Sequence, residues 1–464
     1  MTVAEFKWAL KKGTGPGAQW RKAEFHVHAP ASSDYQYREA DSVAKLGEAL
    51  KSQELSFAVI LKHEAFPSRE ELTALNAHCP NSKLIPGAEI NVFVDAISKK
   101  VNKDYFFHCI LAVDPESDGD YRYILNKAQE RFSHRSGSYP AGFTSSILDL
   151  GRFFREEGAL FIPAHLHQGK SAENSRSIDD IYGDEAFLGF VRDGAFDALE
   201  VRDPTTARFF DGRQKTKEGL EIPHSICVAS SDAHHHEHIA SRGRTTWVRV
   251  EDNTYRELTA ALSFRHRVAL SRPVESHPRI IGVHIVGSFI PDAWVSLNEG
   301  LNALIGGKGA GKTALLECLR FVLNTPVPKE RAESVNRHID HVLGPSGYVE
   351  CLVKRDDGTE SLLTRRADSR DRISVTDFSD SINWRNASDG PPFPISILGW
   401  HEIEAVADRA QARVELVDRV GDPSVVRTAH EKIKEQIERA RDRVPLLQRQ
   451  IKKLDAGLKE LWEL

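Results

Sequence analysis

Cysteine is scarce in this sequence, and its distribution argues against a disulfide-stabilised fold. The chain has 5 cysteines among 464 residues, an odd number, and no two of them form a C-x-x-C pair. Disulfide-rich secreted domains carry even numbers of cysteines at short, regular spacings. We therefore expect reduced and mostly buried thiols at Cys79, Cys109, Cys227, Cys318 and Cys351.

The sequence also lacks a long apolar run, a secretory signal and a dominant charge. No apolar stretch reaches the roughly 20 residues that a membrane-spanning helix needs. The N-terminal residues have neither the apolar core nor the cleavage site of a signal peptide. A net charge of -5 gives no overall attraction to nucleic acid, so a surface that binds one requires a local basic patch. We predict a cytoplasmic protein with no membrane partner.

The sequence does contain a regular alternation of β-rich runs and polar, helix-like stretches. Such an alternation predicts repeated β-α units and therefore an α/β fold with a parallel sheet or barrel. At roughly 100 to 200 residues per domain, the chain is long enough for two or three domains. The expected strands are FHV, FAVIL, KLIPGAEINVFV, YFFHCILAV, ALFIPAHL, FDALEV, ICVASSD and TTWVRV, between residues 25 and 250. Their number suits a barrel better than an open sheet.

Side chains that bind metals follow these runs, at the ends where barrel strands converge. An isolated histidine is more often a satisfied polar group than a ligand, but spacing changes that balance. His26 and His28 alternate along one strand and so share a face, and Asp232-Ala-His234 repeats the pattern at another strand end. Glu89 offers a carboxylate that can bridge two cations. The predicted metal ligands are His26, His28, Asp34, His63, Glu89, His108, His165, Asp232 and His234.

Other polar residues near these donors are open to two interpretations. Arg242 and Arg244 could clamp a substrate phosphate, although an arginine that simply lies at the surface is the commoner case. Glu200 ends a strand and is either structural or a support for a ligand. The remaining histidines of the region could be extra ligands or proton donors, but we expect them to lie away from the metals; they are His167, His235, His236 and His238.

The ordered motifs resemble the polymerase and histidinol phosphatase (PHP) family. The matching segments are FHVH with Asp34, ILKHE, PGAEI, FFHCI, PAHLH and SSDAH, over roughly residues 20 to 250. The resemblance implies a distorted seven-stranded (β/α)7 PHP barrel that holds up to three metals. It implies that His26, His28, Glu89 and Asp232 hold the first metal, Glu89, His108 and His165 the second, and Asp34, His63 and His234 the third.

The chemistry that such a site supports is hydrolysis of a phosphoester. Water that bridges two divalent ions has its pKa lowered from about 15.7 toward neutrality, so hydroxide is available for in-line attack on phosphorus. Histidine and carboxylate ligands suit two or three ions of Zn²⁺, Mn²⁺ or Fe²⁺, and the sequence does not select among these metals. We expect the catalytic residues to be His26, His28, Glu89 and Asp232.

A second motif, GGKGAGKT, predicts a site for ATP with Mg²⁺. It meets the P-loop pattern G-x-x-x-x-G-K-T, with LNALIG before it as an expected strand and TALLECLRFVLN after it as an expected helix. Backbone N–H groups would surround the β-phosphate, Lys312 would contact the β and γ oxygens, and Thr313 would hold Mg²⁺. The predicted nucleotide-binding residues are Gly306, Gly309, Gly311, Lys312 and Thr313.

The P-loop segment resembles the N-terminal lobe of the ABC-type heads of SMC-, RecF- and RecN-like ATPases, in which a coiled coil interrupts the head. The fusion of the two parts resembles the TrlF-type PHP-ATPase fusions. The sequence departs from that pattern, because Trp400 and His401 lie where a Gln-bearing loop is usual and no Walker B or S-G-G motif follows. The resemblance implies a homodimer through the heads or the coiled coil, and the departures imply weak nucleotide binding and poor ATP hydrolysis.

The C-terminal residues carry the apolar spacing of a coiled coil. From Ile433 to Leu461 the apolar positions are separated by alternating steps of four and three, although Pro445 removes one backbone hydrogen bond. A lone surface helix would suit a broader apolar stripe. Because the heptads run to the last residue, we expect the natural protein to be longer. The predicted domains are a PHP-like domain in residues 1–275, an ATPase-head lobe in residues 276–425 and a coiled-coil segment in residues 426–464.

Three functions of different classes remain open from the sequence. The first is a metal-dependent phosphoesterase, a nuclease acting on DNA or RNA in nucleic-acid processing or anti-phage defence, controlled by an SMC-like ATPase. The second is a small-molecule phosphomonoesterase with a regulatory nucleotide-binding module. The third is an assembly module whose donors have become structural, and the filled donor positions make it the least favoured.

Overall fold

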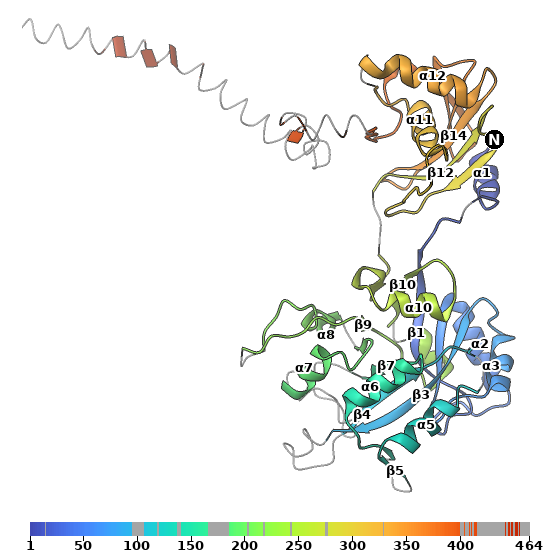
Figure 1. Cartoon of the computed structure of the whole chain (residues 1–464), viewed down its shortest axis with the longest axis vertical. Helices are drawn as coiled ribbons and strands as arrows, with labels where there is room; N and C mark the ends of the chain where they lie inside the picture. The colour runs from blue at the N-terminus through green and yellow to red at the C-terminus, as the bar shows by residue number, and fades with distance from the viewer. Residues whose placement is uncertain are drawn as a thin grey trace, which may run out of the picture. The chain divides into compact units, whose positions relative to one another are not determined.

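The computed structural model describes most of residues 1–399 and divides the chain into two compact units (Figure 1). The N-terminal unit comprises Gly15–Ser276 and Leu297–Leu301, and the C-terminal unit comprises Met1–Thr14, His277–Ser296 and Asn302–Leu464. The description leaves out residues 14, 95–105, 118–119, 137–140, 166–184, 202–203, 217–218, 242–243, 274–276 and 328, and all but isolated positions of 400–464. Among the described residues, no helix is long and apolar enough to cross a membrane.

A mixed sheet forms the centre of the N-terminal unit (Figure 1). Its strands lie in the order β11-β10-β1-β2-β3-β4-β7, in which β1, β2 and β3 are parallel, whereas β4, β7 and β10 run antiparallel to their neighbours. The strands are β1 (Gln19–His28), β2 (Leu55–His63), β3 (Lys83–Phe93), β4 (Phe106–Ala112), β7 (Leu160–Pro163), β10 (Thr246–Val250) and β11 (Val268–Ala269). The short strands β5 (His134–Arg135) and β6 (Gly142–Phe143) attach to β3, and β8 (Leu199–Glu200) pairs in parallel with β9 (Cys227–Val228).

The expected strands are present, but the described strands form a mixed sheet and a separate pair instead of one closed parallel barrel. Among the described residues, the hydrogen-bonded path ends at β11 and β7, and the β8-β9 pair stands apart. The strands nevertheless surround one apolar cluster, which contains Phe25, Val59, Ile110, Ile162 and Val228. The strands β4 and β7 are mostly buried along their length, as strands of a parallel sheet are, so their apolar composition does not reveal that they run antiparallel to their neighbours.

Helices pack against the outer side of this sheet and also against the apolar cluster inside it, to which the last helix contributes Tyr255 and Leu258. One buries Leu46 and Leu50 against Val27 and Ile60 of the first two strands. Another begins with a capping box, in which the Ser68 hydroxyl accepts a hydrogen bond from the Glu71 backbone amide and the Glu71 carboxylate accepts one from the Ser68 backbone amide. The helices are α2 (Ser42–Ser52), α3 (Arg69–Asn76), α5 (Tyr123–Arg131), α6 (Ile147–Glu156), α7 (Glu185–Arg192), α8 (Pro204–Phe209), α9 (His236–Ser241) and α10 (Tyr255–Ala261), followed by the 3-10 helix η2 (Arg265–Arg267).

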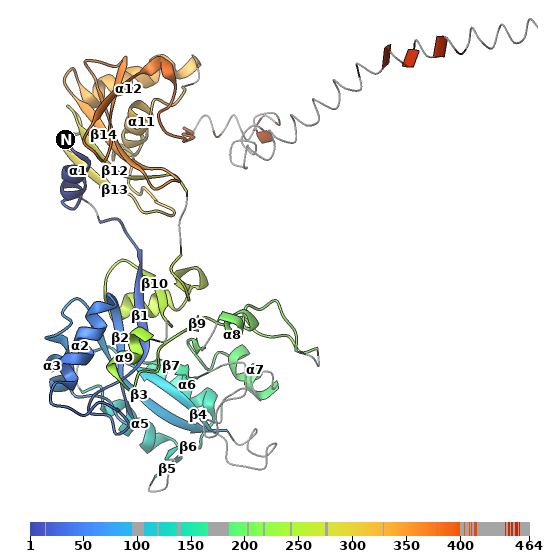
Figure 2. The same cartoon turned by 180° about the vertical axis from the view of Figure 1, so that it is seen from behind.

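An antiparallel sheet forms the C-terminal unit (Figure 2). The β14-β15 hairpin turns at Asp356-Asp357-Gly358, with Gly358 at a φ of 84°, as its D-D-G sequence predicts. The order is β13-β12-β14-β15-β16-β17. The strands are β12 (Arg279–Val286), β13 (Ala293–Ser296), β14 (Tyr348–Lys354), β15 (Glu360–Arg366), β16 (Arg372–Thr376) and β17 (Ile382–Asn386).

Helices cover both faces of this antiparallel sheet. Cys351 and Leu363 pack with α11 (Lys312–Val322) and α12 (Ala332–Leu343) on one face. Leu352 and Leu362 point to the other face and pack with α1 (Val3–Leu10), which lies beside the sheet in Figure 2. The sequence placed residues 1–275 in one domain, whereas here the first helix belongs to the C-terminal unit. The 3-10 helices η3 (Lys329–Arg331) and η4 (Ala387–Asp389) complete the unit.

Two features of the C-terminal unit differ from expectation or lie outside the described residues. The expected strand LNALIG has no strand partner among the described residues, and Leu301 and Ile305 are 96% and 94% exposed. An apolar run forms a strand only where a neighbouring strand pairs with it, and the described part of the chain supplies none here. The predicted coiled coil in residues 426–464 falls almost wholly outside the described residues and stays a prediction.

Candidate metal centre

A β-bulge in β1 turns two histidines toward the interior of the N-terminal unit. β1 pairs with β2 at Glu24 and next at Val27, across three residues of β1 but only two of β2. Before the bulge Phe25 points into the apolar cluster inside the sheet, and after it Val27 points outward to α2. His26 and His28 flank Val27 and therefore point inward, where both are fully buried.

The segment that follows β9 brings a second pair of donors beside the first. Ala233 forms a parallel bridge with β1, through hydrogen bonds with the His26 carbonyl (3.2 Å) and the His28 amide (2.9 Å). Asp232 and His234 flank Ala233, just as His26 and His28 flank Val27, the residue of β1 that pairs with Ala233. Asp232 Oδ1 consequently lies 3.5 Å from His26 Nε2 and 3.3 Å from His234 Nε2.

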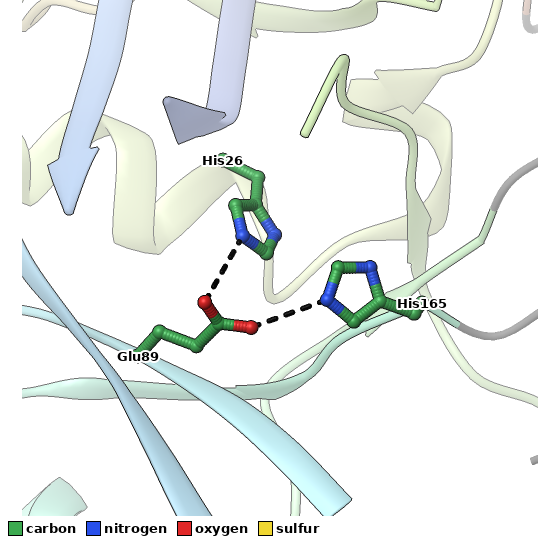
Figure 3. A group of neighbouring side chains, drawn as sticks. All are labelled: His26, Glu89 and His165. Atoms are coloured by element: carbon green, nitrogen blue, oxygen red, sulfur yellow. Dashed lines mark hydrogen bonds and ion pairs between the residues drawn. The ribbon is translucent and has the colours of Figure 1, made fainter. Parts of the chain in front are cut away.

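Glu89 lies at the centre of the donor set. It is 2% exposed and sits on β3, opposite His63 in the register of β2 and β3. Its Oε1 atom is 2.6 Å from His108 Nδ1 and 3.1 Å from His165 Nε2. Figure 3 shows His26 and His165 directed at different oxygens of this carboxylate. The Oε2 atom faces three ring nitrogens, at 3.3 Å from His63, 3.4 Å from His28 and 3.6 Å from His26.

Asp34 closes the other side of the donor set. Its carboxylate lies 2.6 Å from His63 Nε2, 3.1 Å from His234 Nδ1 and 3.4 Å from His28 Nδ1. The Ser32 hydroxyl donates a hydrogen bond of 2.6 Å to the same carboxylate. All nine predicted donors are therefore brought together, although they come from segments spread over more than 200 residues.

Two of the donors occupy left-handed backbone conformations that residues with a side chain rarely adopt. His165 has a φ of 63° and Asp232 a φ of 52°. Glu64, which follows the donor His63, also has a φ of 52°. Such conformations cost on the order of 1–3 kcal/mol and persist where the surrounding structure enforces them, often at functional sites.

The donor atoms form four overlapping triplets, each compact enough to surround one cation. Each triplet has three donor atoms within 4.8 Å of one another. The resemblance implied three ligand sets, and the triplets share members with these sets without reproducing them. The triplets are His26 with His28 and Asp232, His26 with Glu89 and His165, His28 with His63 and Glu89, and His28 with Asp34 and His234.

The chemistry of the donor set fits divalent cations. Nδ1 of His28 and Nδ1 of His234 are buried nitrogen atoms without a hydrogen bond of good geometry, a costly state that a cation would relieve. Burial and the nearby His28 ring lower the pKa of His234 to about 4. A neutral imidazole is the form that binds a metal.

The buried charges of the site balance one another. Burial acts to raise the pKa of Glu89, but His108 and His26 next to it hold that pKa well below its ordinary value. Burial acts to lower the pKa of His26, yet the carboxylates of Glu200, Glu89 and Asp232 raise it well above its ordinary value. The carboxylates and the neighbouring imidazole rings thus shift one another's pKa in opposite directions.

The structure adds one buried carboxylate that the sequence did not single out, Glu24, and decides between the two interpretations of Glu200. Glu24 is 1% exposed and accepts a hydrogen bond from the backbone amide of Ser231, beside Asp232. Glu200 Oε2 lies 3.0 Å from His26 Nδ1, which supports the second of its two interpretations. Glu24 has no local signal, because its contact joins positions 207 apart in the chain.

The structure describes some of the other residues with open interpretations. His235 and His236 stack on each other at 4.3 Å and pack against the ring of Tyr37. Arg244 is half-buried. His167 and Arg242 lie outside the described residues.

The predicted nucleotide-binding residues form an exposed loop at the start of α11. Gly309 and Gly311 have φ values of 83° and 86°, which glycine adopts without strain. Lys312 Nζ donates hydrogen bonds to the carbonyl oxygens of Gly306 (2.6 Å) and Gly307 (2.8 Å). Thr313 is exposed in the first turn of the helix. A phosphate at this N-terminus would replace these carbonyl oxygens as partners of the lysine.

Comparison with known proteins gives a family match for the second part of the chain. Residues 283–463 match the family model of an AAA domain. No curated protein matches the chain.

Solved structures similar to this chain include hydrolases. PfuEndoQ, a lesion-specific endonuclease from Pyrococcus furiosus, is 14% identical with a TM-score of 0.35, over 53% of this chain and 56% of that one. Endonuclease Q in complex with a 27-mer duplex containing an abasic lesion is 14% identical with a TM-score of 0.34, over 54% and 58%. A putative metal-dependent phosphoesterase from Bifidobacterium adolescentis is 14% identical with a TM-score of 0.30, over 52% and 95%. The chain thus spans little more than half the length of the endonucleases it matches.

Proposed function

We propose that the N-terminal unit is a metal-dependent phosphoesterase and that it acts as a nuclease on DNA or RNA. The observation that carries the proposal is the position of Glu89, whose two oxygens face two different groups of histidines. A carboxylate of this kind can be shared by two neighbouring cations, which is the arrangement of two-metal phosphoesterases. The order of the donor motifs, which resembles that of the PHP family, supports the same conclusion.

The residues of the chain have separate roles in this proposal. Divalent cations bound here would supply a water molecule of lowered pKa and positive charge for the phosphoryl oxygens. Glu89 holds the donors of both sides in register, and the neutral His234 offers a lone pair at working pH. His26 and His28 are fully buried, and Asp232 lies beside them with a side chain that is 15% exposed. No side chain of the chain is required as a nucleophile.

The C-terminal unit is proposed to bind ATP with Mg²⁺ through the P-loop and to regulate the access of substrate to the metal centre. The AAA family match over residues 283–463 supports a nucleotide-binding role. We further propose that this unit is an SMC-like head, that residues 426–464 form the start of a coiled coil, and that two chains associate through these parts. Association is tested by the molar mass in solution with and without ATP.

Substitution of the buried donors tests the proposed hydrolase. We expect Asp232→Ala and His26→Ala to reduce hydrolysis of oligonucleotides with Mn²⁺ by more than the roughly 10- to 100-fold typical of residues behind a metal ligand. His236→Ala is the matched control, because this histidine lies close to the donor segment in sequence but stacks on His235 instead. Equal activity of Asp232→Ala and the unaltered chain would refute the assignment.

A substrate panel separates the nuclease from the phosphomonoesterase. The panel contains single- and double-stranded DNA, RNA, bis(p-nitrophenyl) phosphate, nucleotides and sugar phosphates. A nuclease cleaves internal diester bonds, whereas a monoesterase removes terminal phosphates and leaves those bonds intact. Release of phosphate from monoesters alone would favour the phosphomonoesterase over the nuclease. A chain that binds no metal would favour the assembly module, in which the donors have only a structural role.

A further inference from the structure

Glu200 is a buried carboxylate that touches two donor segments without being one of the nine donors. It lies at the end of β8 and is 3% exposed. Its Oε2 atom lies 3.0 Å from Nδ1 of His26 and accepts a hydrogen bond of 3.1 Å from the backbone amide of His165. One oxygen atom thus connects β1 with the segment that follows β7.

The contact with His26 selects which ring nitrogen faces the site. A carboxylate beside Nδ1 keeps the proton on that nitrogen, so the lone pair of the neutral ring is on Nε2. Nε2 of His26 points to the donors, at 3.6 Å from Glu89 and 3.5 Å from Asp232. Without Glu200, the ring could rotate or adopt the other tautomer.

The contact with His165 stabilises a backbone conformation that is otherwise unfavourable. His165 has a φ of 63°, and its amide points to Glu200 while its ring Nε2 lies 3.1 Å from Glu89. The amide would lose its partner if the carboxylate were removed, and the donor ring is attached to the same residue. Both donors that meet Glu89 in Figure 3 therefore depend on the same neighbour.

The backbone that carries Glu200 is fixed on both sides. Leu199 donates to the carbonyl of Ile226 (2.8 Å), and Val201 donates to the carbonyl of Val228 (2.8 Å). This short parallel pairing holds β8 against β9, whose chain continues directly to Asp232. A carboxylate on a rigid and buried strand is suited to orienting other side chains.

From this geometry we propose that Glu200 is a positioning residue of the metal centre, which sets the orientation of His26 and His165 and thereby the affinity for the cation that these two donors share with Glu89. The proposal rests on the proposed metal-dependent function. It assigns Glu200 no contact with substrate or cation.

Two substitutions at this position separate orientation from packing. Glu200→Met keeps nearly the same side-chain length but removes the hydrogen-bond acceptor, whereas Glu200→Gln keeps a carbonyl oxygen that can accept both bonds. The C-terminal unit supplies a matched control in Glu350, which lies 2.8 Å from Nδ1 of His284 in an equally buried pair. Glu350→Met removes the same kind of contact away from the nine donors.

The experiment measures metal affinity of the full chain by competition with a chelator for Zn²⁺ and Mn²⁺, together with thermal unfolding in excess EDTA. We expect Glu200→Met to weaken the affinity for at least one cation by about 10- to 100-fold. Glu200→Gln should recover most of the loss, and Glu350→Met should leave metal affinity unchanged while lowering the unfolding temperature. Wild-type metal affinity in Glu200→Met, or an equal loss in Glu200→Gln, would overturn the proposal.

Metal affinity and hydrolysis are measured separately, so the result distinguishes failure of the proposed phosphoesterase function from failure of the proposed role of Glu200. A chain that binds metal with the expected ranking of variants but cleaves no phosphoester would contradict the proposed function and leave the role of Glu200 standing. A chain that cleaves bis(p-nitrophenyl) phosphate while Glu200→Met binds metal normally would contradict the role of Glu200 alone. If Glu200→Met does not fold, an affinity for Glu200→Gln within about threefold of wild type supports the proposal, and a loss beyond tenfold overturns it.

Discussion

At the scale of single residues, the site depends on one carboxylate more than on any single histidine. Glu89 is 2% exposed and its oxygens lie within 3.6 Å of five ring nitrogens. His108 pairs with Glu89, packs its ring against that of His165, and has a side chain that is 37% exposed. Substitution of Glu89 should therefore lower the amount of bound metal more than substitution of His108.

Glu89→Gln should cost the chain more bound metal than His108→Ala. The glutamine has one oxygen and no charge, so it cannot bridge two cations, whereas loss of His108 removes one ligand of one cation. Elemental analysis after gel filtration of Mn²⁺-loaded protein measures the number of ions per chain. Equal metal content in the two variants would mean that Glu89 is not shared.

A second residue-scale prediction concerns the pH dependence of stability. Burial raises the pKa of Asp197 above its ordinary 3.8, although the Phe161 amide and Arg155 oppose the shift. A carboxyl whose pKa is raised on folding stabilises the fold most below the pKa of the unfolded chain, and this contribution is lost as the pH rises through the folded pKa. The contribution of Asp197 to the free energy of unfolding therefore begins to fall near pH 4 and continues to fall as the pH rises.

In the unaltered chain the Phe161 amide donates a hydrogen bond of 2.7 Å to the Asp197 carboxylate. Asp197→Asn keeps an oxygen that can accept this bond but removes the titrating group, and with it the loss of stability at higher pH. Relative to the unaltered chain, the variant should gain stability as the pH rises from about 4 to 7. Unfolding temperatures of both proteins in EDTA across this range provide the measurement. A difference that does not change with pH would show that Asp197 does not titrate abnormally.

At the scale of elements, the sequence predicted where strands lie better than how they pair. The H-x-H and D-x-H spacings identified donors that share a face, and β1 and the segment at Ala233 do lie side by side. The bulge that turns His26 inward directly after Phe25 leaves no mark in the sequence, because alternation alone would send residues 25 and 26 to opposite faces. The direction of β4 was also hidden, since a buried strand looks the same in either direction.

Long-range contacts explain the other differences between expectation and structure. Glu24 contacts a segment 207 residues away, so no local pattern marks it. Glu200 was open to two interpretations in the sequence, and its contact with His26, 174 residues away, decides between them. LNALIG has the composition of a strand but lacks a strand partner among the described residues. The predicted N-terminal domain began at residue 1, whereas the first helix packs with the sheet of the C-terminal unit, a long-range contact that no local pattern marks.

Phe6→Ala tests the placement of that helix. Phe6 is fully buried and its ring lies 5.2 Å from that of Trp294, so its truncation should destabilise the C-terminal unit by about 3–5 kcal/mol. Trp8→Ala is the control, because Trp8 is 63% exposed and a surface substitution usually changes stability by about 0.5 kcal/mol or less. Thermal unfolding with and without metal reports the two units separately. Loss of the metal-stabilised transition in Phe6→Ala would place the helix with the N-terminal unit.

At the scale of the whole molecule, the proposed cation site and the proposed phosphate-binding loop lie in different units of the chain. The two sites use different chemistry, since one gathers histidines and carboxylates and the other presents backbone amides and one lysine. Independent sites predict that each can be removed without loss of the other.

Lys312→Ala should weaken ATP binding by at least about tenfold, because it removes a charge-assisted contact typically worth about 1.5–3 kcal/mol. Metal content and hydrolysis of bis(p-nitrophenyl) phosphate should be unchanged, whereas any effect of ATP on oligonucleotide cleavage should disappear. Titration with a fluorescent ATP analogue and Mg²⁺ measures the binding. If ATP still changed oligonucleotide cleavage by the variant as it does for the unaltered chain, the P-loop would not be the site through which ATP regulates cleavage.

Crystallographic anomalous scattering from the Mn²⁺-loaded chain tests the shared cation cluster most directly. Data collected on the two sides of the manganese absorption edge should show at least two peaks among the nine donors. Each peak should lie roughly 2.0–2.3 Å from its ligands, and two peaks should share Glu89. A single peak that does not touch Glu89, or no peak at the donors, would contradict the account.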